Sequence, residues 1–327
     1  MLGVDLGGTK VAVATLHERS LSQSDLTPTD LSSADALVSQ LASLIARHGS
    51  DDLDAVGIGV PSVVQFETGR VVSSVNVPLR DVKLRTVLQE RLGMPVFVDN
   101  DATVAALAEA HDEELNLVAR DLVMLTVGTG VGGGIVIGGR IYRGATGGAG
   151  EFGHTLVGLE LAQSVPPPES FPQPGSLEFV ASGHTLDRVA EQTAERHPES
   201  MLGQLRADGK EVSGPDAVRS AREGDAEAQR IVSLWGQRLG IGIANAINTF
   251  DPEEVVIGGG AGQAGDLLLE PAKRVAEGYV VPGLGKRTTI RLARHGPQAG
   301  VLGAALLAQY EIEEVAQAPR EVTEVSS

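Results

Sequence analysis

The chain has 327 residues, a length that exceeds one compact core and fits two domains of about 150 residues each. Its 43 acidic and 26 basic residues give a net charge of −17, which disfavours nucleic acid or an anionic membrane surface as a partner. The absence of cysteine excludes disulfides, thiolate metal sites and a cysteine nucleophile.

The first predicted elements are two strands, at residues 2–6 and 11–16, joined by a glycine turn. No secretory signal precedes them and no apolar run reaches the roughly 18 residues that span a membrane, so we expect a cytoplasmic protein. A helix is expected from Ser32, where Asp35 stands at capping-box spacing. Its predicted buried face holds Leu37, Leu41, Leu44 and Ile45.

Two further strands, at residues 55–60 and 96–98, complete the first half of the chain. The second of them runs into Asp99, which we expect at the surface, and then into an alanine-rich helix over residues 102–110. We expect the boundary between the two domains to follow this helix, near residue 112.

The second half begins again with a strand, a glycine turn and a strand, which indicates a weak internal duplication. The elements expected there are strands at 122–127, 135–137, near 141, 255–257 and 288–294, and helices at 225–248, from about 266, and at 299–310. Glycines at 236, 240 and 242 in the long helix are expected to let another backbone pack closely. Residues 317–327 are expected to form a disordered tail.

Three glycine-rich turns each follow a predicted strand, at residues 7–10, 128–134 and 258–260. Backbone N–H groups in such turns form anion-binding concavities, and the side chains of Thr9, Lys10 and Thr129 add donors. A tight hairpin that needs a positive φ explains any one turn equally well, but three in one chain favour a polyphosphate ligand. The second turn matches the dinucleotide fingerprint, yet it opens a strand and not a helix, and no P-loop sequence is present.

Asp101 is the best candidate for a general base, because it stands where a strand ends and a helix begins. The N-terminus of a helix favours an ionised carboxylate, which can take the proton from an incoming hydroxyl group. The alternative is that Asn100 or Asp101 only caps the helix.

Glu151 and His154 stand three residues apart after a loop of small residues. A carboxylate and an imidazole in such a loop suit hydrogen bonds to the vicinal hydroxyls of a sugar. Half of a metal site is the alternative, which would need further ligands on facing helices. The other six histidines are expected at the surface or at helix ends: His17, His48, His111, His184, His197 and His295.

These segments together resemble the ROK (repressor, open reading frame, kinase) family, and in particular its bacterial glucokinases. The motifs that carry the resemblance span almost the whole chain in the family's order, at residues 5–10, 100–109, 126–134, 143–154, 256–260 and 300–305.

The resemblance implies an α/β protein of the actin-like ATPase (ribonuclease H-like) fold, with two domains closing over a central cleft. Residues 1–112 with 298–316 would form one domain and 113–297 the larger one. The implied reaction transfers the γ-phosphoryl group of ATP, with Mg²⁺, to a hexose hydroxyl, most simply the 6-hydroxyl of glucose. A homodimer or homotetramer is implied, with the sugar as small-molecule partner and no nucleic acid or membrane.

The resemblance also implies roles for individual residues, with Asp101 as the general base. Sugar hydroxyls would be held by Asn76, Asn100, Glu151, His154 and Glu178. The nucleotide and its phosphates would be bound by Asp5, Gly8, Thr9, Lys10, Gly128, Thr129, Gly130, Gly259 and Gly260, with Asp5 acting on Mg²⁺ indirectly.

One departure from the family is the cysteine zinc motif that commonly follows the histidine. Glu169, Phe171 and Ser176 stand where its three cysteines would be, so that zinc site cannot form and no structural zinc is expected. We expect Phe171 and the neighbouring prolines to hold the loop of Glu178 instead.

Two smaller departures, Ser62 and Thr103, lie near the expected sugar pocket and leave the hexose open: mannose, fructose or an N-acetylhexosamine are alternatives to glucose. A non-catalytic sugar sensor, a sugar-responsive repressor and a chaperone-type ATPase are rivals from other classes. The repressor needs a helix-turn-helix segment before the first strand, for which we expect no room because that strand begins at residue 2.

Overall fold

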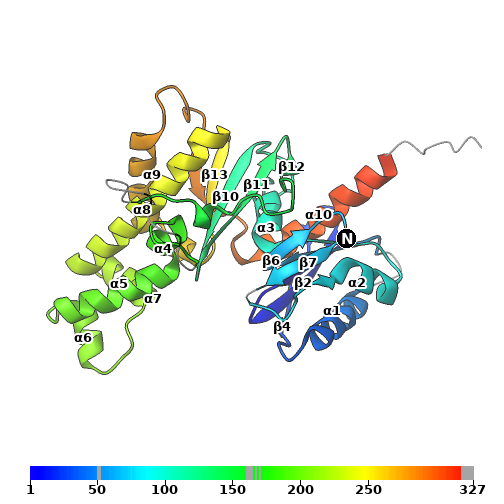
Figure 1. Ribbon diagram of the computed structural model, residues 1–327, viewed down its shortest axis with the longest axis horizontal. Coiled ribbons are helices and arrows are strands. Elements are labelled where there is room, and N and C mark those ends of the chain that lie inside the picture. Colours follow the sequence, from blue (N-terminus) through cyan, green and yellow to red (C-terminus); the bar gives the residue numbers. More distant parts are fainter. Residues whose placement is uncertain (50–52, 75, 160–164, 166–167, 169–170, 318–327) are drawn as a thin grey trace, which may run out of the picture. The chain divides into compact units, whose positions relative to one another are not determined.

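The computed structural model describes residues 1–49, 53–74, 76–159, 165, 168 and 171–317 (Figure 1). Residues 318–327 of the expected disordered tail lie outside this part of the chain. The chain forms two compact units: the first unit comprises Met1–Ala108 and the chain from Gly300 on, and the second unit is Glu109–Ala299. No helix within the described ranges is long and apolar enough to cross a membrane.

The main sheet of the first unit has the strand order β3–β2–β1–β5–β9, with β4 paired to β2. β1 runs antiparallel to β2 and parallel to β5, and β5 runs parallel to β9. These strands are β1 (Leu2–Leu6), β2 (Lys10–His17), β3 (Ser20–Leu21), β4 (Asp25–Pro28), β5 (Val56–Val60) and β9 (Val96–Asn100). A smaller sheet joins β6 (Ser62–Gln65), β7 (Arg70–Ser74) and β8 (Val82–Lys83).

Three of the four helices in the described part of the first unit, α1, α3 and α10, begin near the residues that the sequence predicts, whereas α2 is not anticipated. The four are α1 (Ala34–His48), α2 (Leu84–Leu92), α3 (Asp101–Glu109) and α10 (Ala299–Gln317). The four aliphatic residues predicted for the inner face of α1 are all buried. The predicted cap is wrong by one residue: the Ser33 hydroxyl accepts the N–H of Ala36, whereas the Ser32 hydroxyl donates to Asp30.

Helix α10 lies directly on β5 and α3 because glycines remove the side chains between them. A Cβ atom at Gly57 would overlap the carbonyl oxygen of Ala304, and one at Gly303 would overlap that of Val104. Backbone therefore meets backbone on both sides of α10, which fixes the helix that carries Asp101 against the sheet.

The sheet of the second unit repeats the plan of the first and confirms the internal duplication. Its order is β12–β11–β10–β13–β14, with an antiparallel β10–β11 pair and parallel β10–β13 and β13–β14 pairs. The strands are β10 (Leu122–Val127), β11 (Val131–Ile137), β12 (Arg140–Ile141), β13 (Glu254–Gly258) and β14 (Thr289–Leu292). Three 3₁₀ turns are η1 (Phe152–His154), η2 (Gly260–Ala264) and η3 (Gly296–Gln298).

Six helices accompany this sheet in the described residues, and four of them, α4–α7, are not anticipated by the sequence. They are α4 (Leu177–Ala181), α5 (Gly183–Arg196), α6 (Met201–Ala207), α7 (Gly214–Arg222), α8 (Ala226–Phe250) and α9 (Asp266–Tyr279). The close packing predicted for the long helix is confirmed: a Cβ at Gly236 would lie 2.5 Å from the carbonyl oxygen of Leu268, and one at Gly240 equally near that of Ala272.

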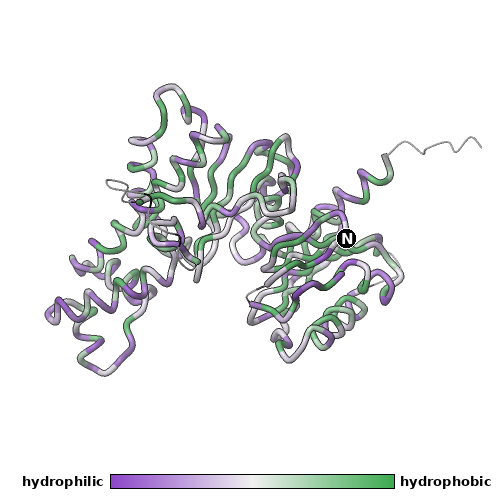
Figure 2. Tube along the Cα trace, viewed as in Figure 1, coloured by the Kyte–Doolittle hydropathy of each residue, from purple (hydrophilic) through white to green (hydrophobic). Residues whose placement is uncertain are grey.

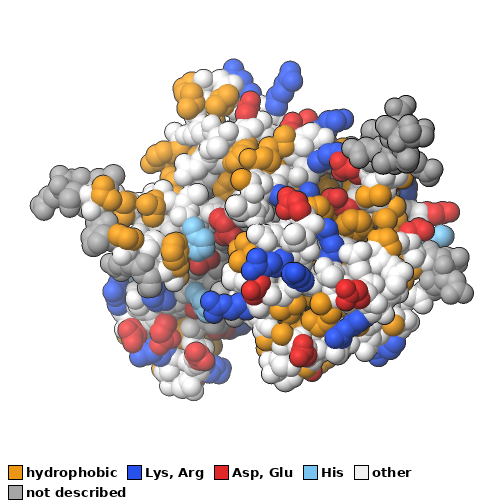
Figure 3. Space-filling model, turned by 45° about the vertical axis from the view of Figure 1, so that its right-hand side comes forward, with side chains coloured by type: hydrophobic (Ala, Val, Ile, Leu, Met, Phe, Trp, Pro, Cys, Tyr) orange, Lys and Arg blue, Asp and Glu red, His pale blue; other side chains and the backbone are white. Residues whose placement is uncertain are grey.

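Side-chain polarity follows this architecture. The central strands of both sheets are mostly hydrophobic, whereas the outer helices alternate hydrophilic and hydrophobic residues (Figure 2). Acidic and basic side chains are interspersed over the face in Figure 3, so the negative charge is not gathered in one patch there.

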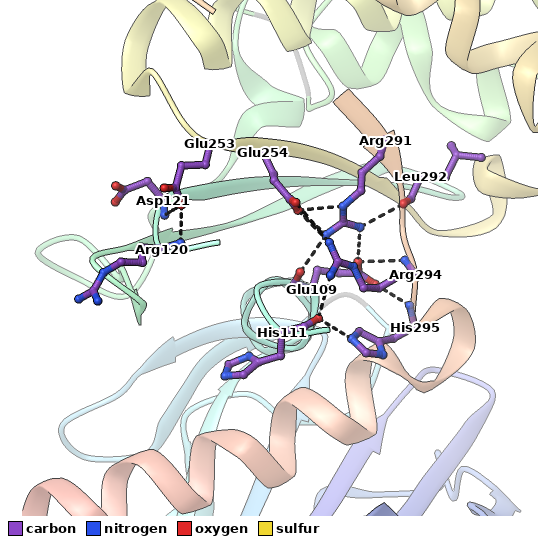
Figure 4. Close-up of polar contacts among 10 residues, drawn as sticks. All are labelled: Glu109, His111, Arg120, Asp121, Glu253, Glu254, Arg291, Leu292, Arg294 and His295. Carbon is purple, nitrogen blue, oxygen red and sulfur yellow. Dashed lines mark hydrogen bonds and ion pairs between the residues drawn. The ribbon is translucent and has the colours of Figure 1, made fainter. Parts of the chain in front are cut away.

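A buried ionic cluster ties the end of α3 to the end of β14 (Figure 4). The Glu109 carboxylate is fully buried and accepts the Arg291 guanidinium at 2.6 Å, together with the N–H groups of Arg294 and His295. His111, expected at the surface or at a helix end, stands two residues after α3 and is 2% exposed; its carbonyl oxygen lies 2.9 Å from Nε2 of His295.

Candidate active site

Three parallel strands of the first unit end at the same level. Asp5 on β1 is paired in register with Gly59 on β5, which is paired with Asp99 on β9. The expectation that Asp99 lies at the surface is wrong, because it is 2% exposed and accepts the N–H of Asn100 at 2.9 Å. The carboxyl ends of parallel strands are where α/β proteins bind their ligands.

Of the two capping candidates that the sequence offers, Asn100 makes the hydrogen bond of a cap. Asn100 caps α3, since its side-chain oxygen accepts the N–H of Thr103 at 3.1 Å and its amide donates to the carbonyl of Ser62 at 3.3 Å. Asp101 is the first residue of α3, partly buried, where the helix N-terminus favours a carboxylate. Its Oδ1 accepts the N–H of Ala102 at 2.8 Å, and Asn100, not Asp101, accepts the N–H of Thr103.

Asp5 has a perturbed carboxyl group at the end of β1. Burial raises its pKa to about 6, and the positive charge of Lys10 opposes that rise. A Cβ at Gly300 would lie 2.5 Å from the carboxylate, so the start of α10 leaves room for the side chain only because that residue is glycine.

The first glycine turn joins β1 to β2 in the same unit. The N–H of Gly7 bonds the carbonyl of Lys10 at 2.9 Å, and Thr9 and Lys10 are exposed. Neither Gly7 nor Gly8 has a positive φ, but a Cβ at Gly7 would lie only 3.1 Å from the carbonyl oxygen of Lys10. Asn76 lies beside Gly8, 3.3 Å from a Cβ built there, which brings two of the predicted site residues together.

The second and third glycine turns meet in the second unit around a cavity of about 600 Å³. Three residues predicted for the nucleotide site line this cavity: Gly128, Thr129 and Gly260. Gly259 is needed for the backbone itself, with a φ of 76° and the carbonyl oxygen of Val127 2.5 Å from a Cβ built there.

Most of the cavity's other residues are not among the predicted site residues, because no helix is expected between residues 177 and 222. The first residues of α5 and α7, Gly183 and Gly214, line the cavity, so two helix N-termini face it. Arg219 and Arg222 add positive charge. A serine before each helix, Ser182 and Ser213, was the available signal.

Glu151 directly precedes the short turn η1 and His154 is its last residue, and both side chains are open to solvent. Their side chains are 54% and 38% exposed, with Oε2 of Glu151 3.7 Å from Nε2 of His154. The ring of Phe171 meets the edge of the His154 ring at 5.2 Å. Within the described residues, no group of three or more His, Asp or Glu side chains could hold a metal ion.

Helix α4 carries Glu178 and is anchored at both ends by the second unit. The N–H of Val157 bonds Gly175 at 2.8 Å before the helix, and the indole of Trp235 bonds the carbonyl of Ala181 at 2.7 Å at its end. Phe171, expected to hold this loop, is 73% exposed and contacts His154 instead; Glu169 lies outside the described residues. Backbone pairing and Trp235 therefore hold α4.

Comparison with known proteins agrees with this arrangement. The ROK family matches residues 1–311. A glucokinase of Halalkalibacterium halodurans is 35% identical over 319 residues, 95% of each chain, and an N-acetyl-D-glucosamine kinase of Aliivibrio fischeri is 31% identical over 93% of this chain and 98% of its own. A ROK family glucokinase from Streptomyces griseus, solved with glucose and AMPPNP, has a TM-score of 0.77 at 32% identity, covering 95% of this chain and 99% of that one.

The two sheets of like topology and these structural neighbours define the class: the protein has the actin-like ATPase fold. Within that class, the chain belongs to the ROK family.

Proposed function

We propose that the protein is an ATP-dependent hexose kinase that transfers the γ-phosphoryl group to the 6-hydroxyl of glucose. The observation that carries the proposal is the cavity of the second unit, where two glycine turns meet two helix N-termini. The family and the relatives named glucokinase support the same class of reaction.

The cavity has the chemistry that a nucleotide requires. Val127, Leu186 and Ala261 supply apolar surface for a base. The helix N-termini with Arg219 supply positive potential for phosphates, which Asp187, also in the lining and bonded to the N–H of Gly214 at 2.7 Å, partly offsets. Gly128 has neither a positive φ nor any atom within 4 Å of an added Cβ. The protein itself therefore does not require glycine there, whereas a phosphate that approaches the backbone does.

Asp5, Thr9 and Lys10 fit the phosphate and magnesium roles in the first unit. The Asp5 carboxyl, whose pKa burial raises to about 6, would be ionised by a nearby cation, and carboxylate oxygen is a preferred ligand type for Mg²⁺. Thr9 and Lys10 are exposed donors in the adjoining turn. When bound, Mg²⁺ neutralises charge on the phosphates.

Asp101 would accept the proton of the attacking hydroxyl group, with the sugar oriented by its neighbours. Asn100 donates one amide N–H to the carbonyl oxygen of Ser62, and its second amide N–H would donate to a sugar hydroxyl. The remaining sugar contacts are assigned to Asn76, Glu151, His154 and Glu178. These residues would position the reactants, which is most of what phosphoryl transfer requires of a protein.

ADP release from ATP and Mg²⁺ tests the proposal on glucose, mannose, fructose and N-acetylglucosamine. General-base assistance contributes about 10²–10⁴-fold, so Asp101→Asn should lose at least that much turnover on the best sugar. Asp35→Asn is the matched control, an exposed aspartate in the first turn of α1, and should retain full turnover.

The outcomes separate the alternatives. Preferred turnover on a sugar other than glucose would keep the kinase and change its substrate; the N-acetyl-D-glucosamine kinase at 31% identity is the reason to include that sugar. Sugar binding without turnover on any hexose would contradict the kinase and favour a sensor. Normal turnover by Asp101→Asn would refute the base.

A further inference from the structure

Val131, the first residue of β11, is held from two sides by the elements assigned to the sugar. Its N–H donates to Oε2 of Glu178 at 2.8 Å. Its carbonyl oxygen lies against Gly153, where a Cβ atom would overlap it, so η1 with Glu151 and His154 rests on the same residue. Val131 itself is 3% exposed and directly follows residues 128–130, the part of the second glycine-rich segment that forms the turn between β10 and β11.

The contact with Glu178 also accounts for Gly130, the last residue of that turn. A Cβ at Gly130 would overlap Oε2 of Glu178, although the backbone there has no positive φ. Space for the carboxylate thus requires glycine at this position. Gly128, two residues earlier, lines the nucleotide cavity and has nothing within 4 Å of an added Cβ.

We propose that Glu178 is a positioning residue that couples hexose binding to nucleotide binding. Its Oε2 fixes the end of the phosphate turn through the N–H of Val131, while its Oε1 accepts a sugar hydroxyl. This inference rests on the proposed kinase function and adds to it an energetic link between the two ligands. Glu178 would contact the sugar but not the nucleotide, since it does not line the nucleotide cavity.

The coupling has a simple physical source. A glutamate side chain loses conformational entropy when a partner fixes it in one rotamer. If a first partner has already fixed the carboxylate, a second partner binds it without that entropic cost. A bound sugar that orders Glu178 therefore makes its bond to Val131 more persistent, which holds the turn in one geometry for the phosphates. By linkage, the nucleotide must strengthen sugar binding by the same factor.

Calorimetric titration of AMPPNP with Mg²⁺, in the absence and presence of saturating hexose, tests this in the full chain. The sugar is glucose, or the hexose of highest turnover in the panel above. The wild type should bind the nucleotide about 5-fold or more tightly with sugar present, the lower end of typical coupling factors. Gly130→Ala, which displaces the Glu178 carboxylate, should bring the ratio close to one.

Gly128→Ala is the matched control in the same turn, because its methyl group meets no atom of the protein. It is expected to change nucleotide affinity itself but to keep the wild-type ratio. Glu178→Gln has a side chain of equal size and should also lower the ratio. It provides a second test in case Gly130→Ala does not fold. Thermal unfolding of each variant verifies that it is folded.

A wild-type ratio of one, or a full ratio in both Gly130→Ala and Glu178→Gln, overturns the coupling while leaving the kinase intact. Failure of the wild type to bind AMPPNP at all overturns the proposed function and the coupling together. The two failures are therefore distinguishable in one experiment.

Discussion

Removal of the Glu109 carboxylate should destabilise the second unit strongly. In the structure this carboxylate is fully buried and accepts three bonds: from Arg291 at 2.6 Å, from the N–H of Arg294 at 3.0 Å and from the N–H of His295 at 2.9 Å. Glu109→Ala leaves two backbone donors without this acceptor and removes one of the two carboxylates that neutralise Arg291 (Figure 4).

The expected loss follows from these contacts. Breaking a buried ion pair by removing one partner costs about 3–5 kcal/mol, because the other charge stays buried. Arg291 is 18% exposed and keeps Glu254 at 2.5 Å, which places the expected loss toward the lower end, about 3 kcal/mol. Glu109→Gln, which retains an acceptor but not the charge, should lose less than Glu109→Ala.

Urea unfolding followed by fluorescence is the assay, since the single tryptophan, Trp235, belongs to the second unit and reports on it alone. Glu195→Ala is the control: its pair with Arg206 is exposed at 53% and 43%, where ion pairs contribute about 0–1 kcal/mol. If Glu109→Ala shifts the transition no more than Glu195→Ala does, the cluster does not stabilise the unit and the reasoning is refuted.

Three further predictions concern single groups. Burial raises the pKa of Asp5 from 3.8 to about 6, so its ionisation destabilises the folded state as pH rises through that window. Without Mg²⁺ or nucleotide, the free energy of unfolding of Asp5→Asn should therefore exceed that of the wild type by up to about 3 kcal/mol above pH 6 and equal it below pH 4. An equal difference at both pH values in calorimetry would contradict this. The Ser62 hydroxyl is buried without a hydrogen-bond partner among the described residues, so Ser62→Ala should gain about 1 kcal/mol in urea unfolding, and a loss would show that it is bonded. Gly240→Ala should lower the free energy of unfolding by about 1–3 kcal/mol, because its methyl group would overlap the carbonyl oxygen of Ala272. Gly278→Ala in α9 has open space around it and should raise that free energy by about 0.5–1 kcal/mol. Equal unfolding transitions of the two variants, detected by tryptophan fluorescence, would refute the steric argument.

Elements with a strong hydrophobic pattern could be predicted from the sequence. Strands β1 and β10 and the inner face of α1 follow directly from the order of apolar residues. The cap of α1 could not be assigned between two adjacent serines, because Ser32 is drawn to Asp30 and Ser33 is left to cap. Local hydrogen bonds of this kind leave no trace in the periodicity.

Burial of charged residues could not be predicted, because their partners are far away in the chain. Glu109 and Arg291 are 182 residues apart, and only the fold brings them together. The surface assignment of Asp99 failed for the same reason: it stands at the end of a predicted strand, where exposure is the ordinary expectation. The four short helices from Leu177 to Arg222 were missed although serines cap them.

The glycine turns show how the structure sharpens a motif into separate roles. The sequence assigns Gly128, Gly130, Gly259 and Gly260 alike to the nucleotide. The backbone explains Gly259 through its positive φ, and the Glu178 carboxylate explains Gly130. Gly128 and Gly260 have neither explanation, and both line the cavity. Under the proposed function, a phosphate that needs the backbone within reach would account for the missing side chain at these two positions of the cavity wall.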